Sequence, residues 1–155
     1  MLRRMLVPID GSRSSASVVP YAAELAKRLG CRVDVLLVES TGQPDLPHPD
    51  HHRFAEDAGN GKEHDEHMPE DIRQANKRHV RHHAEEFEAL GVTASGHVRS
   101  GAPVDEILQA ALDLRCDLIA MATRHRGRFA RPDASSVAEE VLWRSRLPVL
   151  LVAEG

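Results

Sequence analysis

The chain has 155 residues and a formal net charge of −4, with 41 % apolar and only 3 % aromatic residues. This length predicts one domain over residues 1–155, with a core of Val, Leu, Ile and Ala. The acidic balance argues against a nucleic-acid-binding protein. No apolar run reaches the ~20 residues of a membrane span, and the first residues have no signal-sequence pattern. Cys31 and Cys116 read as buried thiols of a reducing compartment, so we expect a cytoplasmic protein.

The first third of the chain predicts a strand, a helix and a second strand. Residues 5–9 form an apolar run that ends in the polar loop Asp10-Gly-Ser-Arg-Ser14. Apolar residues then recur at helical spacing over 18–29, and Gly30 supplies a stop. The run 33–38 is again apolar and predicts the second strand.

The middle third begins with a change of composition. Residues 41–69 are rich in proline, glycine, acids and histidine, which predicts an exposed, flexible insertion. A helix is expected over 70–90, with Gly91 as its stop and a polar edge strand at 92–98 after it. The predicted apolar face of this helix consists of Ile72, Ala75, Val80, Ala84, Phe87 and Leu90.

The last third repeats the alternation of helix and strand. A helix begins near Pro103, and Ser136-Val-Ala-Glu139 is a capping box that opens another helix. Apolar runs at 117–122 and 148–152 predict two buried strands. The alternation predicts an α/β fold with a parallel sheet and right-handed crossovers. The apolar stripe of the helix after Pro103 comprises Val104, Ile107, Leu108, Ala111 and Leu112.

The histidines raise the question of a metal site. His79 and His83 have the i,i+4 spacing that can place two ligands on one metal, and five further histidines lie among acids in 41–69. However, the sequence has no H-E-x-x-H and no cysteine pair with ligand spacing. We therefore predict a solvated, pH-sensitive loop and no metal site.

Trp143 is the one tryptophan of the chain. It follows Val141 and Leu142, whose helical positions should face the sheet, so Trp143 should point sideways or outward. Two interpretations stay open: an interface with a partner or second protomer, and packing against the base of the chain's own last strand.

Motifs for catalysis are absent from the sequence. It has neither the P-loop pattern G-x-x-x-x-G-K-[ST] nor a G-x-S-x-G elbow. We predict that the protein is not an enzyme, or at most a slow ATP hydrolase that relies on Asp10.

Five stretches together resemble the universal stress protein family, and they keep that family's order along the chain. They are Val7-Pro-Ile-Asp10-Gly-Ser12, Gly101-x-Pro103, Cys116-Asp-Leu-Ile-Ala-Met121, Ser136-Val-Ala-Glu-Glu-Val-Leu142 and Leu147-Pro-Val-Leu-Leu-Val152. The resemblance covers the whole chain except 41–69. It implies a Rossmann-like open sheet of five parallel strands, order 3-2-1-4-5, with helices on both faces. It also implies a stress-related regulatory protein and a homodimer paired through the last strand.

One branch of that family binds ATP or another adenine nucleotide through G-x-x-G, nine residues, and Gly-Ser or Gly-Thr. In this sequence those glycines correspond to Ala122, His125 and Ser135, with Ser136 and Val137 next. The spacing is kept, but every glycine is replaced. His125 is the largest change, because it puts a bulky side chain where phosphates approach. Four arginines in the segment offer replacement donors: Arg124, Arg126, Arg128 and Arg131.

The adenosine half of the site is better preserved. The resemblance implies that Pro8, Ile9 and Asp10 flank adenine and ribose, with Val38 and Met121 completing an apolar slot. A carboxylate at the carboxyl end of a strand can accept hydrogen bonds from ribose. Asp10 before Gly-Ser also suits a turn or a helix entry.

Two functions therefore remain open. The first is a regulatory protein that binds ATP or AMP in a degenerate site. The second is an interaction module of the same fold that binds no nucleotide and contacts an unknown protein partner.

Overall fold

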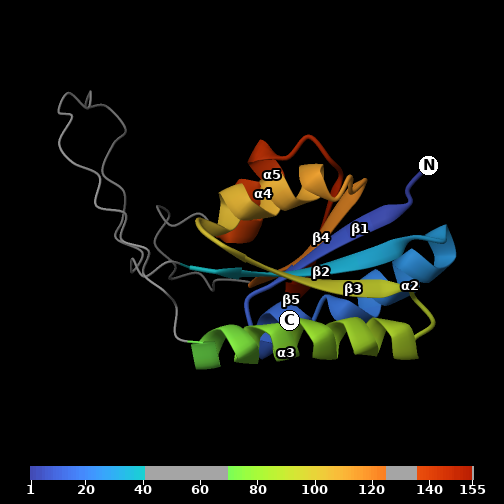
Figure 1. Cartoon of the computed structure of the whole chain (residues 1–155). Coiled ribbons are helices and arrows are strands. Elements are labelled where there is room, and N and C mark those ends of the chain that lie inside the picture. The colour runs from blue at the N-terminus through green and yellow to red at the C-terminus, as the bar shows by residue number, and fades with distance from the viewer. Residues whose placement is uncertain (41–69, 125–135, 155) are drawn as a thin grey trace, which may run out of the picture.

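The computed structural model describes residues 1–40, 70–124 and 136–154, so the predicted insertion 41–69 lies outside the described residues. The described residues form one parallel sheet in the order β3-β2-β1-β4-β5, which confirms the expected topology (Figure 1). The strands are β1 Arg4–Ile9, β2 Arg32–Glu39, β3 Ala94–Ser100, β4 Leu118–Arg124 and β5 Val149–Glu154.

Helices cover both faces of the sheet. Figure 1 shows α2 and α3 below the strands and α4 and α5 above them. The helices are α1 Arg13–Ala16, α2 Val19–Leu29, α3 Glu70–Ala89, α4 Pro103–Asp113 and α5 Val137–Arg144. No helix of the described part of the chain is long and apolar enough to cross a membrane.

Two apolar cores result, one on each face, and β1 contributes to both. Met5 and Val7 are fully buried on the side of α2 and α3, whereas Leu6 is fully buried on the side of α4 and α5. Both faces of β1 are therefore covered, which explains its unbroken apolar sequence.

The predicted helix ends are confirmed. Gly30 adopts the left-handed conformation (φ 66°), and its N–H donates to the carbonyl of Ala26 at the end of α2. Ser136 and Glu139 form both hydrogen bonds of the capping box at the start of α5. One element was missed: residues 13–16, the end of the predicted loop and the stretch after it, form the short helix α1.

The predicted apolar faces were wrong at several positions, including Ala75, which is exposed, and Leu90 just after α3, which is 48 % exposed. Leu112 is 69 % exposed, because the buried face of α4 contains Ala110 and Ala111 and the next residue along the helix lies outside that face. Leu142 is 43 % exposed for the same reason, since Val141 occupies the inward position. Ile72 is 47 % exposed in the first turn of α3.

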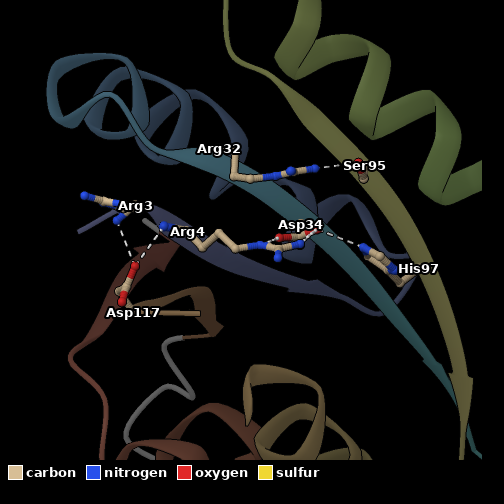
Figure 2. A network of polar contacts seen from close by, with 7 residues as sticks. All are labelled: Arg3, Arg4, Arg32, Asp34, Ser95, His97 and Asp117. Atoms are coloured by element: carbon tan, nitrogen blue, oxygen red, sulfur yellow. Dashed lines mark hydrogen bonds and ion pairs between the residues drawn. The ribbon is translucent and has the colours of Figure 1, made fainter. Parts of the chain in front are cut away.

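A charged network lies inside the sheet, on its α4 side (Figure 2). Asp34 of β2 is completely buried and accepts from Arg4 Nε (2.9 Å) and Arg4 Nη2 (3.2 Å). His97 Nε2 of β3 lies 2.9 Å from the same carboxylate and must donate, because a carboxylate only accepts. The network thus joins the three strands β1, β2 and β3 through one buried charge.

The network determines the charge state of Asp34. Burial alone would raise its pKa, but hydrogen bonds from His97 and Arg4 outweigh burial and hold the pKa of Asp34 below its usual value. A carboxyl group with a depressed pKa stabilises the folded state above its unfolded pKa. That stabilisation is lost as pH falls through the folded value.

We expect Asp34→Asn to lower the free energy of unfolding at pH 7 by about 2–3 kcal/mol, since Arg4 loses its charged partner in a part-buried position. Urea unfolding measures the change. The matched control is Asp113→Asn, whose exposed pair with Arg99 should contribute less than about 1 kcal/mol. The difference between wild type and Asp34→Asn should shrink below pH 4, as Asp34 takes up its proton. Equal stability of the two proteins at pH 7 would contradict this assignment.

Candidate functional site

The predicted adenosine residues meet at the carboxyl edge of the sheet, on three neighbouring strands. β1 lies between β2, which holds Val38, and β4, which holds Met121, and Pro8 itself is in register with Leu36 of β2. Val38 and Met121 pack in the same core, on the α4 and α5 side. Ile9 and Ala122 belong to the opposite core, so their side chains lie on the other face of the sheet from Val38 and Met121. The structure thus brings part of the predicted set together on one face.

Asp10 begins the loop after β1 and is exposed. Its Oδ1 accepts from the N–H of Ser12 (2.8 Å), and its own N–H donates to Ser15 Oγ (3.1 Å). Gly11 between them has a φ of 86°, which favours glycine. The turn role that the sequence allowed for Asp10 is therefore present, and it fixes the carboxylate at the end of β1.

The predicted phosphate half is described only at its two ends. Ala122 lies in β4, and Ser136 and Val137 lie at the start of α5. His125 and Ser135 are outside the described residues, as are the arginines at 126, 128 and 131.

The start of α5 already carries negative charge. The N–H of Ser136 donates to Glu139 Oε2 (3.4 Å), and Glu140 is a second acid in the first turn. A helix N-terminus attracts anions, but here a side-chain carboxylate takes the capping amide. Ser136 is thus less available to a phosphate than the spacing of the motif suggested.

His79 is a residue near the site that sequence reasoning did not assign to it. Its Nε2 is buried without a hydrogen-bond partner among the described residues, 4.0 Å from where a Cβ on Gly11 would lie. Burial lowers the pKa of His79, and the nearby His83 and His82 lower it further, while Asp10 acts in the opposite direction. A neutral imidazole therefore faces the loop that holds Asp10.

The i,i+4 pair of histidines makes its observed contacts within α3. The rings of His79 and His83 meet edge to face with centroids 4.7 Å apart, and His83 Nδ1 lies 2.6 Å from Glu86 Oε2. No group of three or more ligand side chains that could hold a metal occurs in ranges 1–40, 70–124 and 136–154.

Glu39 is a second residue that the sequence did not single out. It is 4 % exposed at the end of β2, where Asn76 Nδ2 (3.0 Å) and Ser100 Oγ (2.9 Å) donate to its carboxylate. These bonds tie the carboxyl end of β2 to α3 and β3, and thereby hold the neighbouring Val38 in place. The only signal in the sequence was an acid directly after an apolar run.

Both cysteines are buried free thiols, as predicted. Burial, followed in size by the charge of Asp34, raises the pKa of Cys116 to about 11. The thiol is therefore protonated at neutral pH and is a poor nucleophile.

The comparisons with known proteins agree with this geometry. A model of the universal stress protein family matches residues 1–153. A universal stress protein of Methanocaldococcus jannaschii is 30 % identical over 153 residues, covering 98 % of this chain and 82 % of the relative.

Solved structures share the fold. A universal stress protein in complex with cAMP is similar with a TM-score of 0.69 at 20 % identity, covering 98 % of this chain and 97 % of that chain. A universal stress protein of Archaeoglobus fulgidus in complex with dAMP has a TM-score of 0.61 at 23 % identity, with 97 % of each chain covered. With the family model matching residues 1–153 and a relative at 30 % identity, this chain belongs to the universal stress protein family.

Proposed function

We propose that this protein is a cytoplasmic, stress-related regulatory protein that binds an adenine nucleotide at the carboxyl edge of β1, β2 and β4. The carrying observation is the arrangement of Val38 and Met121 on one face, with Asp10 fixed in the adjoining turn. Apolar walls with a carboxylate at the strand end suit a base and a ribose.

The ligand we propose is a nucleoside monophosphate such as AMP in preference to ATP. Two of the similar structures hold cAMP and dAMP, each with one phosphate. In this chain Glu139 and Glu140 stand at the start of α5, where a longer phosphate chain would approach. Their charge disfavours each additional phosphate.

A regulatory role is proposed over a catalytic one. The sequence carries neither a P-loop nor a nucleophile elbow. The high pKa of Cys116 gives that thiol no nucleophilic advantage at neutral pH.

Asp10→Asn is the direct test of the ribose contact. Asparagine still accepts from the N–H of Ser12, so the turn is kept while the charge is lost. We expect AMP binding to weaken roughly 10-fold or more, because a hydrogen bond to a charged group is lost. Calorimetry should show a smaller loss for 2′-deoxy-AMP, which lacks one ribose hydroxyl. The control Asp113→Asn should bind AMP like wild type, and an unchanged affinity of Asp10→Asn would rule out the ribose contact.

Glu139→Gln tests the charge at the start of α5. Glutamine preserves the capping box and removes one negative charge. We expect the affinity for ATP to rise about 2- to 5-fold, in line with the effect of one charge at a helix end. Adenosine, which has no phosphate, is the control ligand. An equal change for ATP and adenosine would show that Glu139 does not face the phosphates.

A second candidate function, a protein interaction module, is favoured by Trp143. The residue is 85 % exposed, so its alternative placement against the chain's own last strand is wrong. β5 is an outer strand of the sheet, and we propose that the protein forms a homodimer through β5 in which Trp143 is covered.

The single tryptophan makes this proposal measurable. On dilution, Trp143 fluorescence should shift to longer wavelength as the dimer dissociates and the indole meets water. We expect Trp143→Ser to weaken the dimer in sedimentation while leaving the urea midpoint of the monomer unchanged. Emission that does not change between dilute and concentrated protein would argue against burial of Trp143 in a dimer.

A further inference from the structure

The second outer strand, β3, has backbone groups without a neighbouring strand. The carbonyl of Thr93 accepts from the N–H of Val33 in β2 (2.9 Å). In a parallel pair, alternate residues of a strand bond to the neighbouring strand, so Thr93 and every second residue after it direct their backbone groups toward β2. The residues between them, Ala94, Gly96 and Val98, turn their N–H and C=O groups toward the open edge. Their side chains are small, so they leave this edge accessible to another strand.

An open groove of about 470 Å³ runs along this edge, between β3 and α3. Gly96 permits the close packing of the two elements, because a Cβ there would lie 3.0 Å from Val80 Cγ2. Val80 and Ala84 of α3 form the apolar floor of the groove together with Ala94 and Val98.

Four charged side chains of α3 line the same groove: Lys77, Arg81, Glu85 and Glu88. All four are exposed, and the described residues provide none of them with an ion pair. Along the helix the signs run basic, basic, acidic, acidic. When a second copy of this helix runs antiparallel to the first, each basic side chain of the row therefore lies opposite an acidic one.

We propose that the β3–α3 edge binds a second copy of this chain, with the two β3 strands antiparallel about a two-fold axis. A two-fold axis reverses the direction of α3, so Lys77 and Arg81 lie opposite the partner's Glu85 and the partner's Glu88. Because an isologous interface uses the same patch twice, only a self-complementary patch satisfies it. The outward backbone groups of Ala94, Gly96 and Val98 would pair across the axis and extend the sheet.

A second copy accounts for more of these features than an unrelated peptide does. A peptide strand would satisfy the backbone of β3, but it would leave the ordered row of charges on α3 unexplained. Two copies with their α3 helices parallel would place like charges opposite each other, which disfavours that arrangement. The proposal is independent of nucleotide binding, and it concerns the opposite edge of the sheet from the proposed β5 dimer.

Paired charge reversals test the proposal. Lys77→Glu/Arg81→Glu makes the row wholly acidic, and Glu85→Lys/Glu88→Lys makes it wholly basic. Sedimentation velocity should show each variant associating at least ~10-fold more weakly than wild type through this edge, since like charges then meet. A 1:1 mixture of the two variants should restore association, and 0.5 M salt should weaken it through screening of exposed charges.

The control is Glu24→Lys/Arg28→Glu, which reverses an exposed ion pair on α2 and should associate like wild type. All the altered side chains are exposed, so circular dichroism and urea unfolding should report an unchanged fold. The measurements are repeated in the Trp143→Ser background. This substitution should weaken association through β5, so any association that persists and still responds to the charge reversals is assigned to the β3–α3 edge. Reversal variants that associate like wild type, or a mixture that associates no better than its components, would overturn the proposal.

Discussion

The organising constraint of this molecule is that a parallel sheet must be covered on both faces. β1 is buried from Met5 to Ile9, between the core under α2 and α3 and the core under α4 and α5. Two kinds of sheet surface then remain for recognition: the carboxyl edge, where strand ends meet loops, and the outer sides of β3 and β5. The proposed nucleotide site uses the first, and the two proposed self-association surfaces use the second.

Much of this frame was accessible from the sequence because its signals are local. Apolar runs marked four of the strands and a more polar run marked β3 as an edge strand, while Gly30 and the Ser136–Glu139 capping box marked helix ends. The strand order came from the family resemblance, since periodicity says nothing about which strands are neighbours. Helix faces were predicted less well. Leu112 and Leu142 are apolar at positions one step beyond the buried stripe, and only the packed structure reveals that step.

The polar groups could not be predicted, because their partners are distant in sequence. Asp34 reads as a break in an apolar strand, yet Arg4 lies 30 residues before it and His97 lies 63 residues after it. Their contact depends on the register of three strands. His79 was noted only for its spacing to His83, and its approach to Gly11 arises because α3, packed on β2 and β3, reaches the loop that follows β1. The sequence predicted the candidate site from residues at the carboxyl ends of strands. Ile9 and Ala122 lie at this edge of the sheet, but their side chains are on the opposite face from Val38 and Met121.

The central claim is that Val38 and Met121 form the wall of an adenine site beside Asp10. Methyl NMR during a titration with AMP tests it most directly, because an aromatic base shifts the signals of the methyl groups that it covers. The account predicts saturable shifts for Val38 and Met121, and none for Val92, which precedes β3 at the opposite end of the sheet. Signals of Val38 and Met121 that stay unmoved at millimolar AMP, or shifts confined to other methyl groups, would contradict it.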